Sequence, residues 1–152
     1  MIKNIFDHSV VEEVKKRINN LTPSTTPRWG KMNVAQMLAH CNVTYEMVYT
    51  DKHPKPNAFL KLILKLFVKS KVVGETGYPP NGKTAPQFII TNEKDFELEK
   101  RRLIDFLDKT KNLGADHFDN KESHSFGKLT KDEWNNMFYK HIDHHLTQFG
   151  VN

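Results

Sequence analysis

The chain has 152 residues, of which 38% are hydrophobic, and 23 Lys and Arg residues against 18 Asp and Glu residues give a net charge of +5. This length fits a single domain over residues 1–152 that buries its own core without covalent cross-links. The single cysteine, Cys41, excludes an intrachain disulfide framework. The first residues do not resemble a signal peptide, and no uncharged run reaches the about 20 residues of a membrane span, so we expect a cytoplasmic protein.

The basic residues are spread along the chain and form no long tract. The longest runs are the triplets 15–17 and 100–102, and each has acidic residues close by in a segment with helical periodicity. This pattern is typical of a solvated helix face, so we expect no nucleic-acid partner.

Two helices are expected in the first third of the chain. Residues 7–20 predict the first, with Asp7 as its cap and branched apolar residues at helical spacing. A loop with two prolines ends it, and Asn33 caps the second helix. The apolar stripe of the second helix consists of Val34, Leu38, Cys41, Tyr45 and Val48. Cys41 has no basic neighbour on this stripe, so we expect a buried and unreactive thiol.

The segment Phe59–Lys69 is apolar except for lysines at 61, 65 and 69, which predicts an additional amphipathic helix. One interpretation is an interfacial helix that lies on anionic lipid. The favoured interpretation is a helix packed on the other helices or on a partner subunit, with the lysine stems reaching water. The segment supplies more apolar surface than one face of a bundle can cover, so we predict a homodimer.

The next stretch reads as loop, strand, helix and loop. Gly74–Pro86 has three prolines and three glycines and predicts a long loop, followed by a short strand at Gln87–Thr91. Asn92 is expected to open a third long helix, and Lys111–Lys128 reads as a polar loop.

The final helix begins at a capping-box pattern, Thr130 and Glu133, and runs to about Gln148. Four long amphipathic helices with almost no strand predict an all-α four-helix bundle, with the additional amphipathic helix and the long Pro/Gly-rich loop attached to it.

This final helix has histidines on its inward-facing side. Trp134, Phe138, His141, His145 and Gln148 are spaced 4, 3, 4 and 3 residues apart, which places them on one seam. Residues one turn apart have Cβ atoms about 5–6 Å apart, so the imidazoles of His141 and His145 can reach one metal ion. The neighbouring His144 is turned by about 100° and falls outside the pair. Two core histidines with protein partners for their ring nitrogens are the alternative.

A third ligand has to come from another helix, and His40 is the histidine that stands in the middle of one. By helical geometry His40 borders the apolar stripe of its helix and does not lie at the centre of that stripe. Spacing alone therefore leaves the role of His40 open.

Two blocks of the sequence resemble a known family. The first is PRWGKM at 27–32, running into Gln36–His40, and the second extends from His124–Thr130 through Trp134 to Tyr139–Gly150. Together they resemble the DinB/YfiT-like superfamily of metalloenzymes, in particular a branch classed as a domain of unknown function. The resemblance implies a DinB-like up-and-down four-helix bundle that holds a divalent metal through His40, His141 and His145.

Three imidazoles without a carboxylate or thiolate leave coordination positions open, as in catalytic metal sites. Zinc or nickel suits this ligand set best, and iron or manganese remains possible. Gln36, one turn before His40, and His124, just ahead of the final helix, are candidates for contacts behind the ligands. The favoured alternatives are a solvated helix residue for Gln36 and an exposed loop residue for His124.

The resemblance implies a metal-dependent transferase or hydrolase that activates water or a low-molecular-weight thiol toward a small-molecule substrate. The alternative is a non-catalytic metal-containing binding or stress-response protein, because no general base can be assigned from the sequence.

Overall fold

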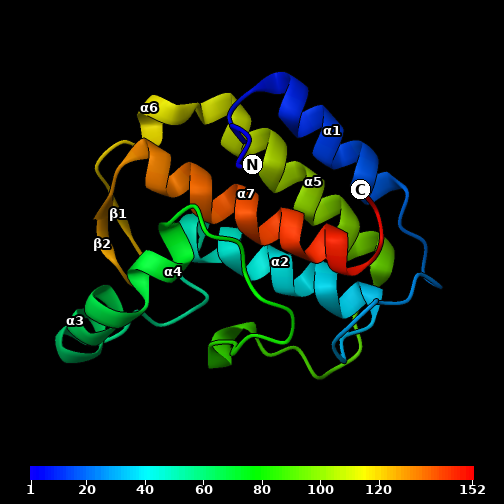
Figure 1. Cartoon of the computed structure of the whole chain (residues 1–152), viewed down its shortest axis with the longest axis horizontal. Coiled ribbons are helices and arrows are strands. Elements are labelled where there is room, and N and C mark those ends of the chain that lie inside the picture. The colour runs from blue at the N-terminus through cyan, green and yellow to red at the C-terminus, as the bar shows by residue number, and fades with distance from the viewer.

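The computed structural model describes residues 1–152 and shows a mostly helical chain, as expected (Figure 1). The four long helices lie side by side and are α1 (His8–Asn19), α2 (Val34–Tyr49), α5 (Phe96–Leu113) and α7 (Lys131–Gln148). Both α1 and α2 pack against α5 and α7, and their apolar faces enclose one core. The shorter elements are α3 (Ala58–Phe67), α4 (Lys69–Val73), the 3-10 helix η1 (Pro86–Phe88), α6 (Ala115–Phe118), β1 (Lys121–Ser123) and β2 (Gly127–Leu129). None of the helices combines the length and the apolar character that a bilayer-spanning segment needs.

Aromatic side chains fill the core around the first turns of α7. Tyr45 of α2 stacks on Phe138 with ring centroids 5.1 Å apart, and Phe118 meets Trp134 and Phe138 at 5.5 Å. All four rings are buried. The same seam of α7 continues into His141 and His145, so the histidines begin where the aromatic core ends.

The caps of two long helices are as the sequence predicts. The Asn33 side chain accepts from the backbone N–H of Gln36, and Gln36 in turn accepts from the backbone N–H of Asn33. Thr130 and Glu133 form the same reciprocal pair at the start of α7. Asp7 precedes α1, but its carboxylate accepts from the Asn4 side chain at 2.8 Å and makes no cap bond.

The start of α5 and the stretch before it differ from the prediction. The helix begins at Phe96 and not at Asn92, because Asp95 supplies the cap, accepting from the backbone N–H of Leu98 at 2.8 Å. The strand predicted at Gln87–Thr91 is wrong, and the chain instead forms the 3-10 turn η1. No other strand lies there to pair with its backbone groups, and an isolated strand leaves those groups without partners.

The polar loop predicted at Lys111–Lys128 is also wrong in detail. There α5 continues to Leu113, α6 follows, and β1 and β2 form an antiparallel hairpin in which Ser123 pairs with Gly127. Phe118 and Leu129 are fully buried or nearly so, and these two apolar anchors fold the polar stretch back onto α7.

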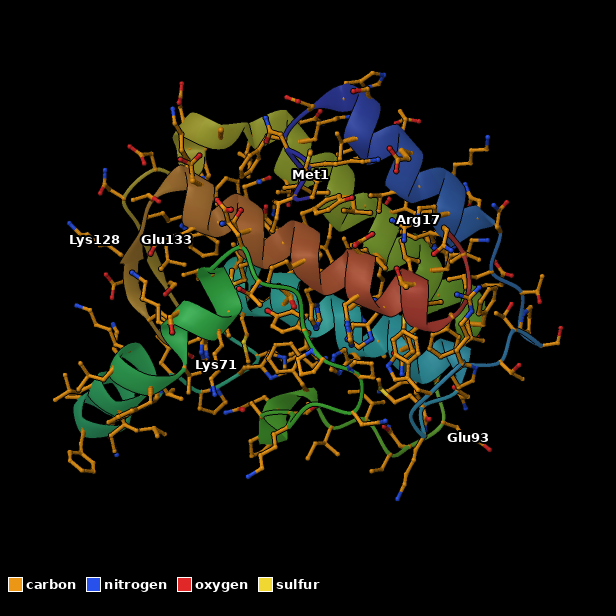
Figure 2. All side chains as sticks on the ribbon, in the orientation of Figure 1. Met1, Arg17, Lys71, Glu93, Lys128 and Glu133 are labelled. Atoms are coloured by element: carbon orange, nitrogen blue, oxygen red, sulfur yellow. The ribbon has the colours of Figure 1, made fainter.

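The lysine-striped segment is helical, as predicted, but breaks into α3 and α4 around Val68. No residue of α3 is buried, and the helix protrudes from one end of the molecule (Figures 1 and 2). It packs against α4 and reaches β1 through an ion pair between Lys61 and Glu122. The rest of the chain therefore leaves the apolar face of α3 uncovered, so the predicted packing on the other long helices does not occur.

Candidate metal centre

Three histidines from two helices converge on one point. His40 comes from α2, and His141 and His145 come from successive turns of α7. One ring nitrogen from each lies within 4.8 Å of the others, and the Nε2 atoms of His40 and His141 are 3.0 Å apart. His40 and His145 are only 4% and 7% exposed, and His141 is partly exposed. We call these residues the three-histidine cluster.

The outer ring nitrogen of His40 has a partner that fixes its proton. His40 Nδ1 lies 2.7 Å from the carbonyl oxygen of Phe88 in η1. A carbonyl oxygen only accepts, so His40 Nδ1 carries the hydrogen and the Nε2 atom of the neutral ring presents its lone pair to the cluster.

His145 is oriented in the same way through Gln148. The amide nitrogen of Gln148 donates to the carbonyl oxygen of Trp29 at 2.7 Å, which fixes the orientation of that amide. Its oxygen therefore faces His145 Nδ1 at 2.8 Å and accepts from it. The Nε2 lone pair of His145 is thus also available to a cation.

The partner of His141 is a hydroxyl group, which can act as donor or acceptor. Its Nδ1 atom lies 3.0 Å from the hydroxyl oxygen of Thr44, one turn after His40 on α2. A hydroxyl group can donate or accept, so His141 can present either an N–H or a lone pair to the cluster.

The electrostatics of the cluster favour neutral rings. Burial lowers the pKa of His40, lowers the pKa of His141 well below its ordinary value, and lowers the pKa of His145 to about 3. The neighbouring histidines add to this shift for His141 and His145. Neutral imidazoles with oriented lone pairs are the state in which histidine binds zinc, nickel, copper or iron, so the donor set fits a divalent metal.

A cavity of about 350 Å³ opens onto the cluster. Its wall has no carboxylate, and most of its residues are polar or cationic. Besides His40 and His145 it is lined by Trp29, Gly30, Lys31, Met32, Asn81, Gly82, Thr84, His144 and Gln148. The cluster is therefore accessible to a small molecule on this side.

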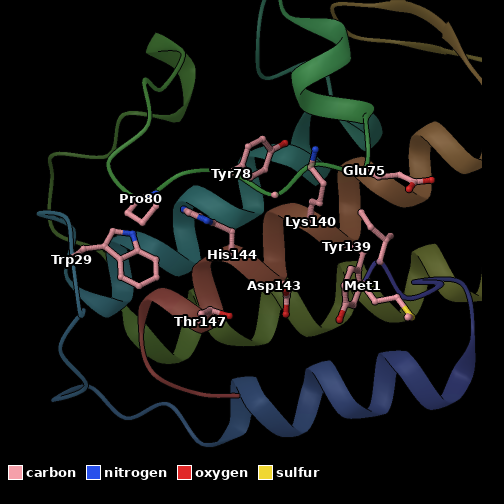
Figure 3. Close-up of a pocket in the computed structure, with 12 residues that line it drawn as sticks. Met1, Trp29, Glu75, Tyr78, Pro80, Tyr139, Lys140, Asp143, His144 and Thr147 are labelled. Atoms are coloured by element: carbon pink, nitrogen blue, oxygen red, sulfur yellow. The ribbon is translucent and has the colours of Figure 1, made fainter.

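His144 lies outside the cluster, as the helical geometry predicts. Its ring contacts Trp29 and Tyr78 with centroids 5.8 and 5.7 Å away, and Figure 3 shows it between these two rings. A second cavity, of about 280 Å³, lies on the other side of this contact, and His144 and Trp29 line both cavities.

The loop after α4 is anchored above α7 by Lys140. Its ammonium group donates to the carbonyl oxygens of Lys71 at 2.8 Å and Gly74 at 2.6 Å, and lies 4.7 Å from the centre of the Tyr78 ring (Figure 3). Lys140 is 6% exposed, and burial lowers its pKa. This anchor holds Tyr78 against His144, and both rings line the cavity of about 280 Å³.

Gln36 and His124, the two candidates for contacts behind the ligands, have hydrogen-bond partners elsewhere. Gln36 belongs to the α2 cap and also donates to the carbonyl oxygen of Asn92 at 3.3 Å. His124 bonds to the Ser125 hydroxyl at 2.7 Å and to the carbonyl oxygen of His53 at 3.1 Å. Neither side chain has a hydrogen bond to the three-histidine cluster.

Phe88, Thr44 and Gln148 supply the groups that do lie behind the cluster, and none of the three was predicted in this role from the sequence. Thr44 lies four residues after His40, and Gln148 lies three residues after His145, so helical spacing carried a signal for both. No spacing pattern in the sequence indicated that the Phe88 carbonyl would lie at His40. Cys41 is buried, as predicted, and burial raises the pKa of its thiol, which disfavours the reactive thiolate.

Comparison with known proteins identifies the family of this chain and gives no other match. No match was found among curated proteins, and none among solved structures. Residues 3–152 match the family described as "Protein of unknown function (DUF1569)". Since this match spans nearly the whole chain, the chain belongs to the DUF1569 family.

Proposed function

We propose that this chain is a metal-dependent enzyme in which His40, His141 and His145 hold one divalent ion. The observation that carries the proposal is the orientation of the rings: His40 and His145 are fixed through Nδ1 with Nε2 facing the cluster, and His141 can adopt the same state. Ligand histidines in metalloproteins are held by such outer hydrogen bonds. Zinc or nickel suits the three nitrogens best, and iron or manganese also fits.

A DinB-like bundle is the fold that we infer for this centre. The support is the resemblance of residues 27–40 and 124–150 to the DinB/YfiT-like superfamily, together with the side-by-side packing of α1, α2, α5 and α7. The histidines come from the second and the last of these four helices, which is the arrangement that the resemblance implies.

The reaction that we propose is attack by a small nucleophile on a small-molecule substrate. A metal with three protein ligands keeps open positions, and the ion supplies a lowered pKa to water or to a low-molecular-weight thiol bound there. The cavity of about 350 Å³ has room for a small substrate next to His40 and His145. Lys31 and Asn81 in its wall offer a cation and an amide to polar groups of that substrate.

One observation favours a second candidate, a non-catalytic metal-binding or stress-response protein. The cavity next to the cluster has no carboxylate that could act as a general base. A binding protein has no need of such a group.

Metal analysis and an activity screen distinguish these functions. The protein is purified without a tag, loaded with zinc or nickel, and assayed with small thiols and electrophiles and with hydrolysable esters and amides. We expect turnover in the loaded protein and its loss in His141→Ala. His144→Ala is the control for metal content, and it should keep the bound ion. A loaded protein that turns over none of these substrates would favour the binding function, and one that holds no metal would refute both.

The predicted homodimer and the cytoplasmic location stay predictions. The uncovered apolar face of α3 leaves room for a partner. However, residues 52–74 have six lysines and no acidic residue, so two copies that met there would repel each other.

A further inference from the structure

The segment around α3 accounts for the whole net positive charge of the protein. Residues 52–74 contain six lysines and no acidic residue. Since six of the 23 basic residues lie here, 17 remain against all 18 acidic residues in the rest of the chain. The net positive charge is therefore concentrated in this segment of the sequence, although the segment contains no long basic run.

Half of these lysines lack a carboxylate partner. Lys52, Lys61 and Lys69 pair with acids on other elements. Lys55, Lys65 and Lys71 are exposed and form no ion pair. These three charges are free to meet an anionic surface.

The same segment has the most exposed apolar face of the protein. Phe59, Leu62 and Leu66 follow helical spacing on one side of α3 and are 74%, 53% and 64% exposed. Phe67, at the end of the helix, is 68% exposed. The helix protrudes from one end of the molecule and none of its residues is buried, so this face is open to solvent (Figure 2).

We propose that α3 is a docking helix that lies flat on an anionic phospholipid membrane. Phe59, Leu62 and Leu66 insert among the upper acyl chains, and Lys55, Lys65 and Lys71 contact the phosphate groups. Amphipathic helices of this kind combine apolar insertion with attraction to anionic lipid. With ten residues α3 lies along the surface and does not cross it.

Charge favours lipid over a second copy of this chain. A homodimer through α3 brings two segments of like charge together, whereas anionic headgroups neutralise the free lysines. The phosphates of a nucleic acid would neutralise the lysines, but the apolar side chains of α3 would stay exposed to water. An anionic bilayer both neutralises the free lysines and buries the apolar face.

The first test is sedimentation of the full-length protein with vesicles. One set contains phosphatidylcholine alone, and the other contains phosphatidylcholine and phosphatidylglycerol at roughly 2:1. We expect about tenfold or greater preference for the anionic vesicles, and weaker binding when salt rises from about 0.1 M to about 1 M, because screening shortens the reach of exposed charges. Equal binding to both sets, or no binding to either, would overturn the proposal.

The second test separates insertion from simple adsorption. Leu62→Ser combined with Leu66→Ser is expected to weaken vesicle binding about tenfold or more, since each leucine loses its burial in the acyl region. The matched control is Leu98→Ser with Leu113→Ser, because these leucines of α5 are also exposed, at 44% and 38%. Equal effects of the two pairs would overturn the role of α3.

A charge variant completes the test. Lys65→Glu is expected to weaken binding to anionic vesicles several-fold, while Lys16→Glu, the same change at an exposed position of α1, leaves it unchanged. If Lys65→Glu weakens vesicle binding and the α3 leucine pair does not, the protein adsorbs electrostatically without insertion, which contradicts the proposal.

Light scattering tests the alternative that a second copy of the chain covers α3. A dimer that dissociates in the variant with both leucine substitutions, together with no vesicle binding by the wild type, would show that this face is a dimer interface.

Discussion

His40 Nε2 lies 3.0 Å from His141 Nε2, a contact that two lone pairs cannot hold without a proton or a cation between them. The Phe88 carbonyl keeps the hydrogen of the neutral His40 ring on Nδ1, so His40 cannot supply that proton. The proton has to come from His141, whose Thr44 partner can reverse its role. A divalent metal ion bound by both nitrogens would take the place of this proton, so the geometry of the cluster suits either a proton or an ion.

Removing one ligand should empty the site. His40→Ala, His141→Ala and His145→Ala are each expected to lose the bound divalent ion, because two imidazoles are a much weaker ligand set than three. Elemental analysis after dialysis measures metal per chain. His144→Ala is the control, since His144 faces Trp29 and Tyr78, and it should keep one ion per chain. Metal loss in His144→Ala with retention in His141→Ala would contradict the assignment of the ligands.

Removing the hydroxyl behind His141 should weaken metal binding without emptying the site. Thr44→Val keeps the size of the side chain but cannot orient His141 Nδ1, and loss of such outer partners lowers affinity about 10–100-fold. Competition with a fluorescent chelator measures the change. Thr147→Val, a substitution on α7 at a residue with no hydrogen bond to the cluster, should bind metal as the wild type does. Equal affinities in the two variants would show that Thr44 does not orient the ligand.

The fold should survive loss of the metal. The buried apolar cluster spans α1, α2, α5 and α7, so the chain has a core of its own, unlike a zinc finger. Circular dichroism should show the same helical signal with and without a chelator. Metal binding should still stabilise the protein by about 2.7 kcal/mol when free metal is a hundredfold above its dissociation constant. Unfolding on chelation alone would mean that the metal is structural.

Acid should destabilise the metal-free protein through the cluster. The pKa values of His40, His141 and His145 are lowered in the folded state, chiefly by burial, while the unfolded chain binds these protons near pH 6.5. The unfolded state therefore takes up more protons as pH falls below about 6.5, and the stability present above that pH is lost progressively toward the folded pKa of His145, about 3. Each such histidine contributes a slope of up to about 1.4 kcal/mol per pH unit.

Urea unfolding of the chelated protein at about pH 7.5 and about pH 5 measures this effect. His145→Asn should show a smaller loss between the two, because it removes one of the titrating rings. Identical midpoints at both pH values in the wild type would contradict neutral, buried ligands.

The part of the site that lies on one helix could be predicted from the sequence, because helical spacing determines which side chains share a face. His141 and His145 fall on the seam of Trp134 and Phe138, and the capping box at Thr130 sets where that helix begins. His40 required the family resemblance, because it borders the stripe of α2 and spacing does not say how far α2 is rotated toward α7.

Features that depend on the path of the chain through space could not be predicted. Asn92 and Asp95 are both good caps, and Asp95 caps α5 because Phe96 and Glu99 are buried against the other helices. The hairpin at β1 and β2 depends on two buried anchors, Phe118 and Leu129, in an otherwise polar stretch. The Phe88 carbonyl reaches His40 across 48 positions of sequence, and no local pattern encodes that distance.

The bond between Phe88 and His40 makes the long connection between α4 and α5 a part of the centre and not merely a tether between helices. A shortened variant that joined α4 directly to α5 would retain all three imidazoles and the apolar core. It would leave His40 without the acceptor that selects its tautomer, and the ring would be free to rotate. In this chain, therefore, the connection between α4 and α5 has to be long enough to bring one backbone oxygen to His40. A design that moved the three histidines to another helical scaffold would need an acceptor in the place of this carbonyl.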